Sequence, residues 1–299
     1  MSDITVSVVM ITYNHEKFIK EALESVFSQK TNFQYEIIIS NDSSTDNTDE
    51  VIKKIIDKNE NDNLINYTNH KNNKGMIPNF LWSIQQAKGK YIALCEGDDY
   101  WTDPYKLQKQ VDFLEANPDY SIHSGLAITS DNKIIGNKNK SSFLLQNFYT
   151  RNNLITCTIL FRNTPLESKW FNNVTFGDWM LYVYVLKYFK NSKAYSDNNV
   201  LSFYRIHDGG IMQTLNEKSK LELAHVEHIY QIKKLTKCKF SDDDFFTINN
   251  YCISLFRHYL KTKNVKLFRT TFINLILSQN RFPLKSYLYY FYKSIKYKD

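Results

Sequence analysis

Apolar runs of strand length alternate with amphipathic helical patterns along the first 116 residues, and this alternation restricts the fold more than any other feature. The apolar runs lie at 4–12, 35–40, 64–68 and 90–95. Helical spacing of apolar residues lies at 15–29, 46–58, 78–87 and 104–116. Strands that alternate with helices pair in parallel and carry helices on both faces of the sheet. The sequence therefore predicts an α/β fold with a parallel, Rossmann-like sheet.

Polar residues collect where three of these predicted strands end. Thr12, Tyr13 and Asn14 follow the first strand, residues 41–44 follow the second, and residues 96–99 follow the fourth. In parallel α/β sheets, ligands bind beyond the carboxyl ends of the strands. Each cluster alone is compatible with an ordinary turn, but three clusters at one edge predict a nucleotide-type site.

The segment Glu96-Gly97-Asp98-Asp99 places three carboxylates within four residues. Carboxylates packed together repel one another and are costly to bury without a partner. Oxygen ligands suit a hard cation, so we expect Mn2+ or Mg2+ as the cofactor at this turn. The alternative is an acidic turn that only leads into the helix beginning near Pro104.

Beyond Pro118 the pattern is mixed, and beyond Leu215 it is helical. Strands are predicted at 120–129, 155–161 and 200–206, a hairpin turn at 130–133, a helix from Asp178 to Phe189, and a polar loop of lid length at 137–153. Helices are predicted at about 216–237, 241–262, 264–278 and 283–297. We therefore expect a sheet-containing domain of residues 1–212 and an all-helical C-terminal extension of residues 213–299.

The net charge of +7 belongs to the end of the chain. Residues 257–299 carry ten Lys or Arg and one acid, a local net charge of +9, which leaves −2 for the preceding 256 residues. A core without excess positive charge argues against nucleic-acid binding. Basic and aromatic residues alternate over 281–298, which suits peripheral contact with an anionic membrane. A helical hairpin that packs on the sheet domain or forms a homodimer explains the same residues, and both interpretations stay open.

The cysteines and the start of the chain bear on its location. Cys95, Cys157, Cys238 and Cys252 lack the spacing of a metal site, so we expect reduced thiols. The first residues lack the basic and apolar regions of a signal peptide, and no apolar stretch approaches the ~20 residues of a membrane span. We therefore expect a cytoplasmic protein, with peripheral attachment at the inner face of the membrane left open.

Four motifs, in this order, resemble those of glycosyltransferase family 2, whose members have the GT-A fold. They are Val8-Val9-Met10-Ile11-Thr12-Tyr13-Asn14, residues 36–48 (EIIISNDSSTDNT), residues 88–94 (KGKYIAL) and residues 96–99 (EGDD). Gly177-Asp178-Trp179 and Tyr204-Arg205-Ile206-His207 resemble the acidic and histidine landmarks of the family. The resemblance covers roughly residues 4–212. It implies a nucleotide-binding half at about 1–100 and an acceptor half at about 101–212.

The resemblance also implies an activity. Family members transfer a sugar, usually with inversion, from a nucleotide-sugar to an acceptor hydroxyl, and they use Mn2+ or Mg2+. For this chain we expect a UDP-linked donor, a glycan or lipid-linked glycan acceptor, and a place in bacterial surface polysaccharide or glycan synthesis. A growing diphosphate charge calls for a cation, and inversion calls for a base opposite the leaving group.

Roles for individual residues follow from their positions in the family pattern. The implied nucleotide-sugar-binding residues are Thr12, Tyr13, Asn14, Asp42, Lys74, Gly75, Asn79 and Asp98. Asp98 is expected to face the ribose or donor sugar, whereas Asp99 and His207 are expected to bind the metal. Asp178 is the expected catalytic base, although an aspartate there also suits a plain helix N-cap. A lone histidine before Asp208-Gly209 is likewise compatible with a turn.

The chain departs from the family pattern at two positions. The second motif reads Asn41-Asp42-Ser43-Ser44 where Asp-Asp-Gly-Ser is more usual, which leaves donor preference open. Gly177 stands where the family often has glutamate.

Two other functions are compatible with a nucleotide-binding α/β fold. A sugar nucleotidyltransferase would be expected to have a glycine-rich loop with a basic residue after the first strand, and residues 12–16 lack one. A non-catalytic nucleotide-binding scaffold acting through its helical tail is the other alternative.

Overall fold

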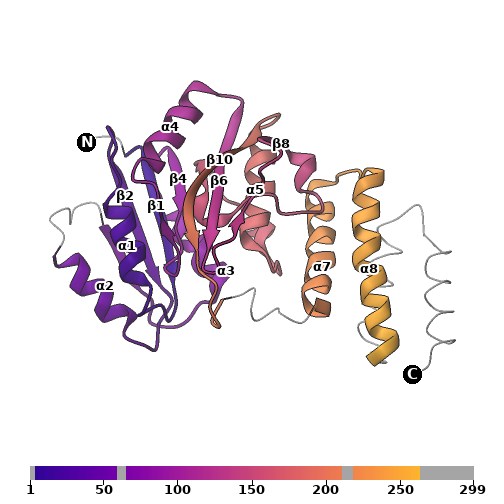
Figure 1. The fold of residues 1–299 in the computed structure, drawn as a ribbon, viewed down its shortest axis with the longest axis horizontal. Helices are drawn as coiled ribbons and strands as arrows, with labels where there is room; N and C mark the ends of the chain where they lie inside the picture. Colours follow the sequence, from indigo (N-terminus) through magenta and orange to yellow (C-terminus); the bar gives the residue numbers. More distant parts are fainter. Residues whose placement is uncertain (1–3, 59–64, 211–217, 263–299) are drawn as a thin grey trace. The chain divides into compact units, whose positions relative to one another are not determined.

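The computed structural model describes residues 4–58, 65–210 and 218–262 (Figure 1). Internal contacts divide the chain into two units, which are treated separately below. The first comprises Met1–Gln146, Asn152–Asn172 and Gly177–Ile206, and the second comprises Asn147–Arg151, Asn173–Phe176 and His207–Asp299. The domain boundary that we expect at residue 212 falls among residues 211–217, outside the described part of the chain.

The first unit is built on a mixed sheet. Its strands are β1 Val6–Thr12, β2 Tyr35–Asn41, β3 Ile65–Asn69, β4 Tyr91–Leu94, β5 Tyr100–Trp101, β6 Tyr120–Thr129, β7 Ile134–Ile135, β8 Ser142–Leu144, β9 Leu160–Arg162 and β10 Lys193–Tyr204. Their order is β3-β2-β1-β4-β9-β6-β10-β5, with β7 paired to β6 and β8 to β10. The first four predicted strands pair in parallel, as the sequence indicates. Beyond these four strands the sheet is mixed, because β9 runs antiparallel to both β4 and β6.

Helices cover both faces of this sheet. They are α1 Ile19–Phe27, α2 Thr48–Ile56, α3 Met76–Gln85, α4 Lys106–Ala116 and α5 Gly177–Tyr188. Val8, Met10 and Ile39 join one core with apolar residues of α1, α2 and α4. Successive side chains of a strand point to opposite faces, so Ser40 points away from that core. Asn79 of α3 bonds to Ser40 there, which places α3 on the second face.

Two predicted strands differ from the structure. Residues 155–161 form a short 3₁₀ helix, η3 Thr156–Thr158, followed by β9. The backbone carbonyl of Cys157 is bonded by side chains instead of by a neighbouring strand. Trp101 Nε1 donates to it at 2.9 Å and Ser202 Oγ at 2.7 Å. The last strand, β10, begins seven residues earlier than we expected. The strand is irregular between Ser196 and Val200, where its register with β6 shifts. The alternation of apolar residues that would have indicated a longer strand is interrupted there.

The polar loop predicted at 137–153 is partly ordered into secondary structure. β8 pairs with the start of β10, and a 3₁₀ helix, η2 Leu145–Phe148, follows it directly. Phe143 within β8 is buried. Backbone pairing and one buried ring therefore attach residues 142–144 to the sheet. A wholly mobile lid would lack both of these contacts.

The second unit contains two long helices among its described residues, α7 Lys218–Thr236 and α8 Asp242–Thr262, close to the positions predicted. Ser241 and Asp244 form a reciprocal cap at the start of α8, since Asp244 accepts from the Ser241 N–H at 2.9 Å and donates its own N–H to Ser241 Oγ. The helices predicted at 264–278 and 283–297 lie outside the described residues. Among those described, no helix has the length and apolar character that crossing a membrane requires.

Candidate functional site

The acidic turn lies directly against the end of β1. Gly97 donates its N–H to the carbonyl of Ile11 at 3.0 Å. A Cβ at position 97 would lie 2.7 Å from Thr12 Oγ1 and 2.8 Å from Thr12 Cβ, closer than side-chain atoms approach. The glycine therefore lets the two strand ends meet, and it brings Thr12 beside the three carboxylates, as the strand order predicts.

Burial and mutual repulsion raise the pKa values of two carboxyl groups of this turn. Burial, and then repulsion from Asp99 and Asp98, holds the pKa of Glu96 well above its ordinary range. Burial, and then the charge of Asp98, raises the pKa of Asp99 to about 7. Glu96 Oε2 and Thr12 Oγ1 are buried and have no hydrogen-bond partner within the described residues. Repelling carboxylates with an orphaned oxygen fit a divalent cation, which would favour their ionised forms.

Asp98 and Asp99 have different surroundings. Asp99 is only 5% exposed, and its Oδ1 accepts the backbone N–H of Arg205 at 2.8 Å. The Asp98 side chain is 20% exposed, and its Oδ2 lies 3.7 Å from Nε2 of His15. His15 thus belongs to the site, although none of the sequence motifs indicated a role for it. Its position directly after the Thr12-Tyr13-Asn14 cluster was the available signal.

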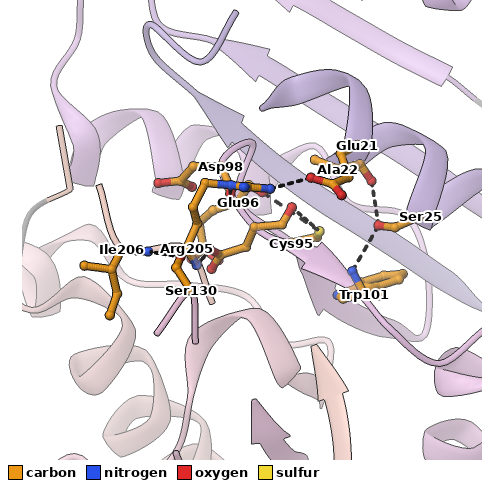
Figure 2. A network of polar contacts seen from close by, with 11 residues as sticks. Glu21, Ala22, Ser25, Cys95, Glu96, Asp98, Trp101, Ser130, Arg205 and Ile206 are labelled. Carbon is orange, nitrogen blue, oxygen red and sulfur yellow. Dashed lines mark hydrogen bonds and ion pairs between the residues drawn. The ribbon is translucent and has the colours of Figure 1, made fainter. Parts of the chain in front are cut away.

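The arginine of the Tyr204-Arg205-Ile206-His207 motif reaches the same turn. Figure 2 shows the Arg205 guanidinium between the acidic turn and Glu21 of α1. The next residue, Ile206, donates its N–H to Ser130 Oγ at 3.0 Å. His207 follows and begins the last segment of the second unit. Two residues of chain span at most about 7 Å, so connectivity alone keeps His207 near Arg205.

Asp42, at the end of β2, holds the loop that precedes α3. Its Oδ1 accepts the N–H of Lys74 at 2.7 Å, and its Oδ2 accepts the N–H of Gly75 at 2.9 Å. Gly75 has φ +85°, a conformation that side chains rarely tolerate. Asp42 also donates its own N–H to the carbonyl of Thr12 at 2.9 Å. The structure therefore brings Thr12, Asp42, Lys74 and Gly75 together.

The loops after β1 and β2 are bonded to each other. Asn14 Oδ1 accepts the N–H of Thr45 at 2.8 Å, and the N–H of Asn14 donates to Ser44 Oγ at 2.9 Å. Asn14 adopts φ +58°, in the left-handed region that asparagine tolerates better than most residues. Its side chain is thus committed to the neighbouring loop, whereas the Tyr13 side chain is 44% exposed.

Asn79 lies beneath this edge and is only 2% exposed. Its Oδ1 accepts from Ser40 Oγ at 2.5 Å, and its Nδ2 donates to the carbonyl of Ser40 at 3.2 Å. His70 Nε2 lies 2.9 Å from the same hydroxyl. Because the single Ser40 proton goes to Asn79, His70 has to donate from Nε2. Both residues therefore attach α3 and the end of β3 to β2.

Asp178 lies in the first turn of α5. Its Oδ2 accepts from Asn152 Nδ2 at 2.9 Å and from Thr156 Oγ1 at 2.8 Å. After burial and the charges of Asp99 and Asp98, the charge of Asp178 is a further cause of the raised pKa of Glu96. A Cβ at position 177 would lie 2.5 Å from Cδ1 of Ile77, so a larger residue there would require the end of the Ile77 side chain to move.

A family model matches the part of the chain that contains Thr12, Asp42 and the acidic turn. The model of glycosyl transferase family 2 matches residues 7–166, more than half of the chain. The chain belongs to glycosyltransferase family 2. The family resemblance stated from the sequence motifs is thereby confirmed.

Relatives of this chain include a β-1,3-glucosyltransferase of Escherichia coli, WfaP. The two are 32% identical over 209 residues, which are 69% of this chain and 79% of WfaP. The name of WfaP gives UDP-glucose as its donor and α-D-GlcNAc-diphosphoundecaprenol as its acceptor. An uncharacterised protein of Mycobacterium tuberculosis is 35% identical over 187 residues, which are 59% of this chain. That match spans about half of the mycobacterial protein, 52% of its length.

Solved structures confirm the GT-A fold of this glycosyltransferase. TarS of S. aureus, solved with UDP-GlcNAc, superposes with a TM-score of 0.56 at 16% identity, covering 93% of this chain and 94% of that one. The mannosyltransferase PcManGT of Pyrobaculum calidifontis, solved with GDP-Man and Mn2+, gives 0.54 at 15% identity, covering 100% and 84%. At these identities the likeness concerns the fold.

Proposed function

We propose that this protein is an inverting, metal-dependent glycosyltransferase that uses a UDP-sugar and glycosylates a lipid-linked glycan in bacterial surface polysaccharide synthesis. The observation that carries the proposal is the acidic turn with its raised pKa values, with the Asp178 charge acting on Glu96 from another element. The carboxylates of the acidic turn suit a cation, and the separate carboxylate of Asp178 suits a catalytic base. The names of WfaP and of the TarS complex support the choice of donor and acceptor classes.

The donor nucleotide is proposed to bind at the edge formed by β1, β2 and the loop before α3. The orphaned hydroxyl of Thr12 and the exposed ring of Tyr13 offer a hydrogen bond and a stacking surface there. Asp42 already accepts two backbone N–H groups, so we propose that it shapes this site through Lys74 and Gly75. A direct bond from Asp42 to the nucleotide would use a remaining lone pair of the carboxylate.

The metal is proposed to be Mn2+ or Mg2+, held at the acidic turn. The sequence led us to expect Asp99 as ligand and Asp98 towards the donor, and we propose instead that Asp98 is a ligand. Asp98 is partly exposed beside His15, whereas Asp99 is buried and bonded to the Arg205 N–H. His207 is proposed as a further ligand because it follows Arg205 by two residues. When bound, the cation would neutralise the charge that develops on the diphosphate.

Asp178 is proposed to take the proton from the acceptor hydroxyl as that oxygen attacks the anomeric carbon. Asn152 and Thr156 both bond to its Oδ2, which fixes the direction of the carboxylate. Within the described residues no bond to Oδ1 is recorded, so this oxygen is the one proposed to receive the proton. A base within hydrogen-bond reach of the nucleophile contributes about 10² to 10⁴ in rate.

The location and assembly are proposals that rest on the sequence. We propose a cytoplasmic enzyme that meets its lipid-linked acceptor at the inner face of the membrane. The basic and aromatic segment 281–298 lies outside the described residues, so membrane contact and homodimer formation through the helical extension both stay predictions.

A thermal-shift panel tests the donor and metal proposals together. UDP, UDP-glucose, UDP-GlcNAc and GDP-mannose would each be added with and without Mn2+. A donor at a hundred times its Kd stabilises the folded state by about 2.7 kcal/mol. For a unit of this size that raises Tm by about 5–10 °C. We expect such a shift from a UDP-sugar only when Mn2+ is present.

A second measurement tests the transfer itself. The purified protein would be incubated with the stabilising donor and a synthetic GlcNAc-diphosphate lipid, and the product examined by mass spectrometry and NMR. A β-linked product from an α-linked donor supports inversion. A lack of thermal response to every nucleotide would contradict the donor site, and a retained anomeric configuration would contradict the assigned mechanism.

A further inference from the structure

Arg205 connects the end of β10 and helix α1 to the acidic turn. Its Nε donates to the backbone carbonyl of Asp98 at 2.8 Å, and its terminal nitrogen donates to the carboxylate of Glu21 on α1. Its backbone N–H donates to Oδ1 of Asp99 at 2.8 Å. In Figure 2 the guanidinium extends from the end of β10 across the turn towards α1. One residue thus contacts both aspartates through different atoms.

Aromatic rings hold this guanidinium in place. Its central carbon lies 4.8 Å from the ring centroid of Phe18, 5.4 Å from that of Phe203 and 5.7 Å from that of Tyr100. Tyr100 and Phe203 are themselves stacked, with centroids 4.7 Å apart and planes 11° from parallel. A planar cation packed against rings has few rotamers left to lose when it bonds to the turn.

The acidic turn has few backbone bonds of its own, so contacts from outside the turn help to keep it closed. Its own backbone closes with one bond, from the Asp99 N–H to the Glu96 carbonyl at 3.1 Å. Three carboxyl groups stand within four residues of that short turn, and they repel one another when they are ionised. Repulsion favours opening the turn when no cation is bound. The Arg205 bonds to Asp98 and Asp99 oppose that opening from outside the turn.

We infer that Arg205 is a positioning residue. Its guanidinium fixes the backbone at Asp98, and its own N–H fixes the Asp99 carboxylate, which holds the acidic turn in cation-binding geometry before the cation and the donor arrive. The effect on cation binding rests on the proposed function, whereas the effect on the turn itself does not. Arg205 acts through the two aspartates. The ion pair with Glu21 contributes little, because the Glu21 side chain is 54% exposed.

Three variants separate this role from plain fold stability. Arg205→Met removes the charge and the side-chain donors at similar length. Arg205→Lys keeps the charge but lacks the planar, forked geometry. Glu21→Gln removes only the exposed ion pair. Lys109→Gln is the matched control, because it breaks another exposed ion pair, with Asp103, in the segment that follows the turn.

Hydrogen exchange of residues 95–101 in metal-free protein is the first measurement. We expect Arg205→Met to speed exchange of the Asp99 N–H by about tenfold to hundredfold, the loss of a charge-assisted bond. Arg205→Lys should show most of this effect, while Glu21→Gln and Lys109→Gln should match wild type. If Arg205→Met does not fold, Arg205→Lys decides the question alone. Wild-type exchange in a folded Arg205→Lys or Arg205→Met protein would overturn the inference.

Calorimetric titration with Mn2+, with and without UDP, is the second measurement. We expect the Kd for Mn2+ to rise at least about tenfold in Arg205→Met and Arg205→Lys, with no change in the control. Unchanged Mn2+ affinity in both arginine variants would overturn the inference. If wild type binds no Mn2+ under either condition, the proposed function fails, and the exchange data still decide whether Arg205 positions the turn.

Discussion

Lys106 is a fully buried lysine on α4, in the helix that follows the acidic turn. Its Nζ lies 4.2 Å from the ring centroid of Trp101 and donates to Gln110 Oε1 at 2.8 Å. Burial is the main cause that lowers its pKa from 10.5 to about 7. We predict that Lys106→Met will change how the free energy of unfolding depends on pH.

The direction follows from proton uptake in the two states. Between pH 7 and 10.5 the unfolded chain keeps a proton on Lys106 that the folded chain has released, so the free energy of unfolding rises with pH. Below pH 7 both states are protonated, and the dependence fades. A shift from 10.5 to about 7 raises the free energy of unfolding by about 2 kcal/mol between pH 7 and pH 9. Methionine does not titrate, so the variant lacks this rise.

Urea titrations of wild type and Lys106→Met at pH 6, 7, 8 and 9 measure the effect. The chain has four tryptophans, Trp82, Trp101, Trp170 and Trp179, and all of them lie in the first unit, so their fluorescence reports its unfolding. Groups other than Lys106 titrate in both proteins and cancel in the difference. Lys109→Met, whose ammonium group is about half exposed, is the control and should follow wild type.

A stability difference between wild type and Lys106→Met that stays constant from pH 7 to pH 9 would refute the reasoning. It would mean that the Lys106 ammonium keeps its proton when folded, through water or a carboxylate that reaches it. The expected result is a difference that grows by about 2 kcal/mol in favour of wild type.

Three further predictions concern the site. Asp178→Asn should lower kcat by about 10²- to 10⁴-fold in a product assay, because an amide cannot take the acceptor proton, while donor-induced thermal shifts persist; undiminished turnover would contradict the base assignment. Gly97→Ala should lower the free energy of unfolding by about 1–3 kcal/mol in urea, because the new Cβ would lie 2.7 Å from Thr12 Oγ1; wild-type stability would mean that the turn shifts freely. Asp98→Asn should raise the calorimetric Kd for Mn2+ at least about tenfold; an unchanged Kd would return the ligand role to Asp99.

Local pattern was sufficient for the nucleotide-binding half of the fold. β1, β2 and β4 are continuous apolar runs with helices between them, so their existence and parallel pairing follow from side-chain periodicity. The same approach missed β5, which has two residues, and misread residues 155–161. The Cys157 carbonyl there is bonded by Trp101 and Ser202, 56 and 45 residues away in sequence. No local pattern encodes such partners.

By itself, the sequence determined the family and the edge of the sheet at which the site lies, because parallel strands send their carboxyl ends to one side. Thr12, Asp42 and the acidic turn could therefore be grouped before any coordinates. The tertiary structure decided which carboxylate is buried and which is partly exposed. It also assigned Arg205 to the turn, through a bond that joins residues 107 positions apart. Burial and side-chain direction depend on such distant contacts, whereas periodicity reports only on neighbours along the chain.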